Sequence, residues 1–117
     1  MSSIWVRRAY DAPGRSDAQR ILVDRLWPRG VSKDDLKLDE WMKDIAPSDD
    51  LREWFNHDAE KWKDFKELYA KELDENEDAV TAIRERISKG RVTLVYGAKD
   101  EDHNNAVALK AYLEEHT

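Results

Sequence analysis

An aspartate and two arginines stand at the end of a predicted buried strand. Residues 20–30 read R-I-L-V-D-R-L-W-P-R-G, which places Asp24, Arg25 and Arg29 after an unbroken apolar run. Charged groups are costly to hold beside a core strand unless a partner or a ligand satisfies them. The guanidinium group of arginine offers a planar fork of donors that suits phosphate or carboxylate. The segment therefore predicts an anion site with a proton-transferring group beside it.

A second set of polar residues follows a second predicted strand, at residues 91–96. If the two strands are parallel neighbours, both sets meet at the carboxyl edge of the sheet, where open α/β sheets bind ligands. We expect the arginines to hold the anion and Asp24 or His103 to transfer protons. The expected ligand-binding residues are Arg25, Trp27, Arg29, Tyr96, Lys99, Asn104 and Asn105.

Each of these residues also has a structural interpretation. Asp24 can fix a nearby arginine or cap a loop, which is the commoner role of such a carboxylate. The arginines can form internal ion pairs, His103 can be a polar residue in the first turn of a helix, and the two asparagines can close a loop. An anion at the start of the last helix is disfavoured, because residues 100–102 are all acidic.

Three long motifs in this chain resemble a known family. They read L-V-D-R-L-W-P-R-G-V-S at residues 22–32, A-P-S followed by L-R-E-W-F-N-H-D at 46–58, and T-L-V-Y-G-A-K-D-E-D-H-N-N-A-V-A-L at 93–109. The chain resembles the YeaO-like branch of the bacterial domain of unknown function 488 family over nearly its whole length. The resemblance implies a single α/β domain at residues 1–117 and supplies no reaction.

More distant branches of that family pair a V-D-V-R-x-x-P strand with a late C-H-R motif. Here V-D-R-L-W-P at residues 23–28 resembles the first motif, and H-N-N at residues 103–105 stands in place of the second. The chain has no cysteine. The resemblance therefore does not carry a thiol-dependent role over to this protein.

Composition excludes several classes of protein. The 117 residues are 39% charged and 40% hydrophobic, which suits one well-solvated globular domain. Without cysteine there are no disulfides and no cysteine-ligated zinc. The three histidines lack metal-ligand spacing, so we expect no metal site. No apolar run approaches the ~20 residues of a membrane span, and residues 1–8 lack a signal-peptide core, so we expect a cytoplasmic protein without membrane contact.

The charge is unevenly distributed. Residues 1–33 hold seven Lys and Arg against three Asp and Glu, whereas residues 34–117 hold thirteen against twenty-three, within a net charge of −6. A local basic surface is thus compatible with an acidic protein whose overall field opposes attraction to nucleic acid. The alternative function is a regulatory, nucleic-acid-associated or protein-interaction module. Its basic face would consist of Arg7, Arg8, Arg15, Arg25 and Arg29.

The element pattern predicts an α/β fold. We expect strands at residues 4–10, 20–26 and 91–96, a short helix at 36–46, a helix capped by Ser48, a long helix from Asp58, a helix at 77–89 ending at Gly90, and a final helix after residue 102. These elements favour a small parallel or mixed central sheet packed by helices, in two or three layers, with Rossmann-like topology.

The leading functional hypothesis is a phosphate or carboxylate site at the carboxyl edge of this sheet. An enzyme acting on a nucleotide or sugar-phosphate compound is one form of that hypothesis. None of the common nucleotide-binding loops is present. The sequence leaves open the reaction, any cofactor, the identity of a small anionic ligand and the oligomeric state.

Overall fold

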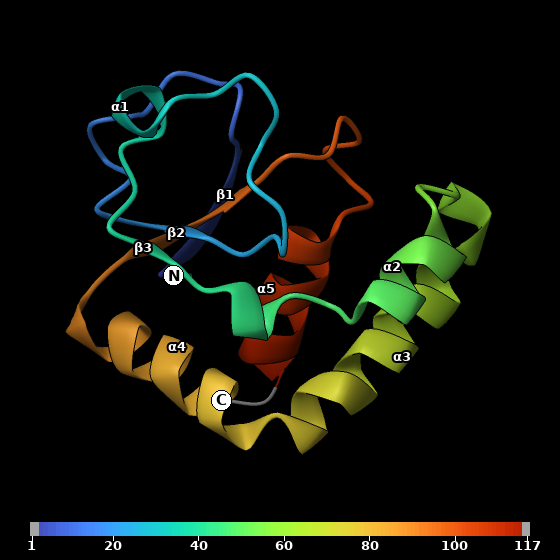
Figure 1. The fold of residues 1–117 in the computed structure, drawn as a ribbon. Helices are drawn as coiled ribbons and strands as arrows, with labels where there is room; N and C mark the ends of the chain where they lie inside the picture. Colours follow the sequence, from blue (N-terminus) through green and yellow to red (C-terminus); the bar gives the residue numbers. More distant parts are fainter. Residues whose placement is uncertain (1–2, 116–117) are drawn as a thin grey trace.

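Four parallel strands form the centre of the protein. The computed structural model describes residues 3–115. Its strands are β1 (Ile4–Arg8), β2 (Gln19–Leu22), β3 (Glu40–Trp41) and β4 (Val92–Tyr96), arranged in the order β1-β4-β2-β3 (Figure 1). Its α-helices are α1 (Lys33–Leu36), α2 (Asp49–Phe55), α3 (Trp62–Glu75), α4 (Glu77–Lys89) and α5 (Asn105–Glu115). The expected α/β fold with a small parallel sheet is confirmed.

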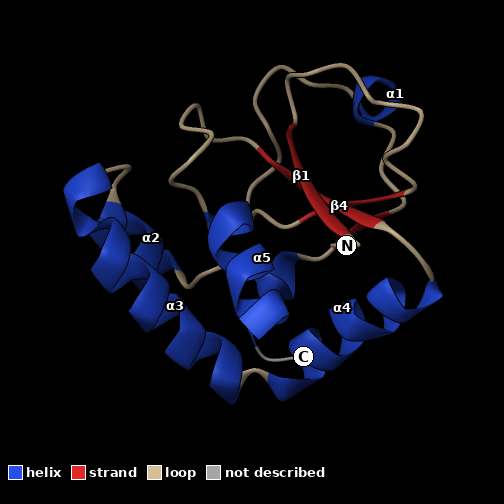
Figure 2. Ribbon diagram, turned by 180° about the vertical axis from the view of Figure 1, so that it is seen from behind, coloured by secondary structure: helices blue, strands red, loops and turns tan. Residues whose placement is uncertain are grey.

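The two faces of the sheet are covered differently. On one face Ile21 and Leu94, which are paired in register, pack in the main core with residues of α2, α3, α4 and α5. On the other face Leu22 and Val95 pack against Leu36 of α1 and against loop residues. Figure 2 shows α1 and the long loops on the side of the sheet away from α4 and α5. All five residues of β4 are buried, because this central strand lies between the two cores.

The local helix signals give the expected elements. The Ser48 hydroxyl accepts a 3.1 Å hydrogen bond from the Leu51 amide and so caps α2. Helix α4 spans Glu77–Lys89 and ends at Gly90, as predicted. Helix α3 begins later than expected, at Trp62, because a 3-10 turn at Ala59–Lys61 comes first.

The predicted helix at residues 36–46 is wrong. Leu36 ends the short helix α1, and Lys37 then takes a left-handed conformation that turns the chain. The following residues extend along β2 as β3, with the Met42 amide donating to the Leu22 carbonyl at 2.9 Å, before a 3-10 turn at Lys43–Ile45. Apolar residues in this segment fit both periodicities, and pairing with β2 decides in favour of the strand.

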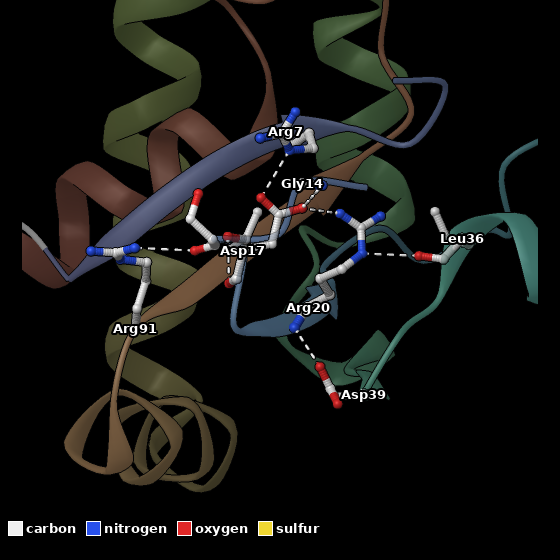
Figure 3. Close-up of polar contacts among 9 residues, drawn as sticks. Arg7, Gly14, Asp17, Arg20, Leu36, Asp39 and Arg91 are labelled. Carbon is white, nitrogen blue, oxygen red and sulfur yellow. Dashed lines mark hydrogen bonds and ion pairs between the residues drawn. The ribbon is translucent and has the colours of Figure 1, made fainter. Parts of the chain in front are cut away.

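A buried ionic cluster fixes the start of β2 on the loop-covered face. Figure 3 shows the Asp17 carboxylate between Arg7 and Arg20, with donor distances of 3.0 Å from Arg7 Nε and 2.5 Å from Arg20 Nη1. The Gly14 amide donates to the same carboxylate at 2.9 Å. Asp17 and Arg20 are only 1% and 4% exposed. Burial alone would raise the pKa of Asp17, but these hydrogen bonds and the charges of the arginines hold it below its usual range.

The backbone around this cluster is tied in as well. Thr93 of β4 donates its hydroxyl to the Asp17 carbonyl at 2.8 Å, and Arg20 Nε donates to the Leu36 carbonyl at 3.0 Å (Figure 3). The cluster therefore joins the loop before β2 to the central strand and to α1.

None of the helices within residues 3–115 has the length and the apolar character that a membrane span needs.

Candidate functional site

A pocket of about 350 Å³ opens between the carboxyl ends of the strands and helix α2. β2 and β4 are parallel neighbours, which is the arrangement required for the two predicted sets of polar residues to meet. The loops that follow these two strands therefore open at the same edge of the sheet. The polar and charged residues that line the pocket are Tyr10, Asp24, Arg25, Trp27, Arg52, Glu53, Asn56, His57, His103, Asn104 and Asn105.

Asp24 holds the two loops together at the pocket. Its Oδ2 atom accepts a 2.8 Å hydrogen bond from the Gly97 amide. Asn105 also contacts this region, since its side chain donates to the Val23 carbonyl at 2.9 Å. Burial raises the pKa of the Asp24 carboxyl, while the bond from Gly97 and the side chain of Asn105 offset part of that effect. Asp24 is thus a partly buried acid with a fixed orientation.

Two arginines that line the pocket converge on one carboxylate. Arg25 follows β2, and Arg52 comes from α2. Their guanidinium groups approach the same atom, Oδ1 of Asp49, at 3.6 Å and 3.4 Å. Arg25 also donates to the Pro47 carbonyl at 3.4 Å and to the Ala46 carbonyl at 3.5 Å. Good charge-assisted hydrogen bonds are about 2.7–2.9 Å long, so these long contacts leave both cations able to accept another anion.

His103 lines the same pocket with a defined ring orientation. Its Nδ1 atom lies 2.9 Å from Oδ2 of Asp100, and its ring meets Trp62 edge-on at 5.3 Å between ring centres. The contact with His103 lowers the pKa of Asp100, together with backbone hydrogen bonds to that carboxylate. When Nδ1 donates to Asp100, the Nε2 atom of the neutral ring is an acceptor. His103 can therefore exchange a hydrogen bond or a proton with a bound molecule.

Asn104 closes the loop before α5. Its side chain is buried, its Oδ1 accepts from the Val107 amide at 2.9 Å, and its Nδ2 donates to the Asp100 carbonyl at 2.9 Å. It thereby caps the first turn of the helix. Both polar atoms of Asn104 are engaged within the protein, so Asn105 is the better placed of the two asparagines to meet a ligand.

Three expected residues lie outside the pocket. Arg29 and Lys99 are exposed, and Tyr96 is a buried residue of the main core. Arg29 falls outside because Pro28 and the left-handed Gly30 turn the chain away at that point, with the Arg29 carbonyl accepting the Tyr10 hydroxyl at 3.0 Å. Trp27 does line the pocket, but its indole NH donates to the Val31 carbonyl at 2.6 Å.

The sequence reasoning missed the contribution of helix α2. Arg52, Glu53, Asn56 and His57 all line the pocket. Arg52 and Glu53 belong to α2, and Asn56 and His57 follow it directly. Spacing along the chain gave no sign of this contact, because α2 reaches the sheet edge only through the turn at residues 42–48. The available signal was the motif at residues 46–58, in which Arg52 and His57 are polar residues that core packing does not explain.

A family model described as "Inactive DUF488-N3 subclade" matches residues 3–117. The chain belongs to this family. It is 42% identical to the uncharacterized protein YeaO of Escherichia coli, covering 95% of this chain and 96% of that one. It is 37% identical to the uncharacterized protein Rv3073c of Mycobacterium tuberculosis, covering 94% of this chain and 92% of that one. No solved structure gives a significant match.

The V-D-R-L-W-P segment and the H-N-N segment meet in this DUF488 member. Asp24 of V-D-R-L-W-P and all three residues of H-N-N line one pocket. Within residues 3–115 no group of three or more His, Cys, Asp or Glu side chains could hold a metal ion. The chemistry that the pocket offers is hydrogen bonding, ion pairing and proton exchange.

Proposed function

We propose that this protein binds a small phosphate- or carboxylate-bearing molecule in the pocket and does not turn it over. The observation that carries the proposal is that Arg25 and Arg52, which both line the pocket, converge on a single carboxylate oxygen of Asp49. Two guanidinium groups within reach of one oxygen form a site that fits an anion of this size. A non-catalytic role agrees with the word "Inactive" in the description of the matching subclade.

A catalytic role is the second candidate. The observation in its favour is that Asp24 and the Asp100-oriented His103 line the same pocket, which gives an acid and a base beside the anion site. The substrate would then be a nucleotide or sugar-phosphate compound. Incubating the protein with such compounds and following them by phosphorus NMR tests this role. Turnover that is lost in His103→Ala would replace the binding proposal.

The basic-face alternative has less support. Arg7 is paired with Asp17, and the Arg8 guanidinium donates to the Ala98 carbonyl at 3.0 Å and lies 5.2 Å from the centre of the Tyr10 ring. These cations already have partners within the protein. A nucleic acid would have to compete with them and with the net charge of −6.

Thermal unfolding with inorganic phosphate, acetate, nucleotides and sugar phosphates tests the binding proposal. A ligand at ~100 times its dissociation constant should raise the free energy of unfolding by about 2.7 kcal/mol. We expect Arg25→Ala and Arg52→Ala to lose most of the shift in melting temperature. Arg29→Ala is the matched control, since it removes the same charge from an exposed position outside the pocket.

The Arg29→Ala control also distinguishes an anion site on the loop at residues 28–30 from one in the pocket. Loss of the shift in Arg29→Ala, with Arg52→Ala unchanged, would place the anion on the loop at residues 28–30 and reject the pocket. No shift with any of these anions would reject anion binding and favour an interaction with another macromolecule.

A further inference from the structure

We infer that the ligand is a monocarboxylate with an apolar body, and that its carboxylate takes the place that Asp49 holds between Arg25 and Arg52. This inference rests on the proposed anion-binding function and narrows it to one ligand class. It also assigns Asp49 the role of an internal competitor. Three features of the site support it: the apolar pocket wall, the balance of charge and the weak attachment of Asp49.

The wall of the pocket is largely apolar. Phe55 of α2 and Phe65 of α3 line it, with their rings stacked at 4.3 Å between centres. Leu26 also lines the pocket and is 61% exposed, so it adds apolar surface that a ligand can cover. The volume of about 350 Å³ is near the lower end of the ~300–1,000 Å³ typical of ligand pockets. One ring or branched chain fits such a space better than a nucleotide.

The charges at the pocket disfavour a ligand with two negative charges. Arg25 and Arg52 line the pocket together with the carboxylates of Asp24 and Glu53. A phosphate monoester would bring close to two negative charges at neutral pH, and a carboxylate brings one. The raised pKa of Asp24 shows that burial already disfavours negative charge at the pocket floor. A monoanion therefore meets less repulsion than a dianion.

Asp49 is positioned as a displaceable carboxylate. Its side chain is 63% exposed, and its two ion pairs are 3.4 Å and 3.6 Å long. Exposed ion pairs of this kind contribute little to the free energy of unfolding. Helix α2 keeps its own cap at Ser48, so the Asp49 carboxylate can leave the arginines without uncapping the helix. The two guanidinium groups are thus held facing a carboxylate that a ligand can replace.

Isothermal titration calorimetry at pH 7 tests the inference with phenylacetate as the probe. Acetate lacks the apolar body, phenylacetamide lacks the charge, and inorganic phosphate supplies the alternative anion. N-acetylphenylalanine has the same carboxylate and apolar ring as phenylacetate and mimics a peptide C-terminus. We expect phenylacetate or N-acetylphenylalanine to bind more tightly than the other three probes, and the tighter of the two to identify the source of the carboxylate.

The role of Asp49 is tested by comparing Asp49→Asn with Asp50→Asn. Both changes remove one negative charge from the first turn of α2, so their long-range effects match. Of these two aspartates, Asp49 is the one whose ion pairs with Arg25 and Arg52 are seen in residues 3–115. We expect Asp49→Asn to tighten phenylacetate binding about two- to fivefold, the range that an exposed ion pair allows, and Asp50→Asn to leave it nearly unchanged.

The outcomes separate this inference from the proposed function. Arginine-dependent binding of phosphate in preference to phenylacetate would overturn the inference and leave the anion site standing. Binding of phenylacetamide as tight as that of phenylacetate would overturn it too. Equal effects of the two asparagine variants would remove Asp49 as a competitor. Absence of binding by every anion would overturn both the inference and the proposed function.

Discussion

The amide of Gly97 donates a 2.8 Å hydrogen bond to the carboxylate of Asp24, 73 positions away in the chain. Asp24 follows β2 and Gly97 follows β4. The bond therefore joins the loops after two neighbouring parallel strands, at the floor of the pocket. It also explains why a carboxylate can stand at this edge, since a partly buried acid with a fixed donor costs less than an unpaired one.

Replacing Asp24 by asparagine should show how much the charge of this carboxylate lowers the free energy of unfolding. Burial in the folded protein raises the pKa of Asp24 above its ordinary value of 3.8, so folding favours the neutral form relative to the unfolded chain. Below pH 3.8 the wild type carries this form and suffers no penalty. As the pH rises through the raised pKa, the wild type loses stability that Asp24→Asn keeps. Urea unfolding between pH 3.5 and 7 should show the free energy of unfolding of Asp24→Asn rising relative to that of the wild type. A relative decrease as the pH rises would contradict this prediction.

Gly97→Ala should destabilise the protein through crowding at Asp24. A Cβ atom on residue 97 would lie 3.2 Å from Oδ2 of Asp24, closer than ordinary contact allows. We expect a loss of about 1–2 kcal/mol in the free energy of unfolding. In an Asp24→Ala background the crowded oxygen is gone, so the same glycine change should cost less. Equal costs in the two backgrounds, measured by urea unfolding, would show that the two residues are not coupled.

Asp17→Ala should be among the most damaging single changes in the chain. It leaves Arg20, which is 4% exposed, without its carboxylate and removes the partner of Arg7. Breaking a buried ion pair in this way costs about 3–5 kcal/mol. The exposed Asp11 in the same loop provides the control, and Asp11→Ala should stay within about 0.5 kcal/mol of the wild type. A small effect of Asp17→Ala in chemical denaturation would mean that the cluster can be rehydrated without loss.

Asn104→Ala should loosen the start of α5. The change removes the cap acceptor for Val107 and the donor to the Asp100 carbonyl. We expect a loss of about 1–3 kcal/mol and faster amide exchange at Val107. Asn104→Ser restores a hydroxyl acceptor at the cap and should recover part of the loss. Identical exchange rates at Val107 in wild type and Asn104→Ala would show that this cap does not hold the helix.

Elements whose signals are local could be predicted from the residues alone. Helix α4 ends at Gly90 and α2 begins at Ser48 because capping depends on residues within one turn. The apolar runs of β2 and β4 predicted buried strands. The rule that parallel strands present their ends at one edge then brought Asp24 and residues 103–105 to the same pocket.

Where a segment was compatible with more than one structure, contacts between distant segments selected the one that forms. Residues 38–41 became extended because backbone groups of β2 were there to pair with them, and no local signal distinguishes that outcome from a helix. Arg52 lines the pocket, whereas the predicted Arg29 does not. The packing of α2 against the rest of the fold fixes the position of Arg52, and the turn at Gly30 directs Arg29 away. Residue types specify which chemistry is available, whereas contacts between distant segments specify which residues share a site.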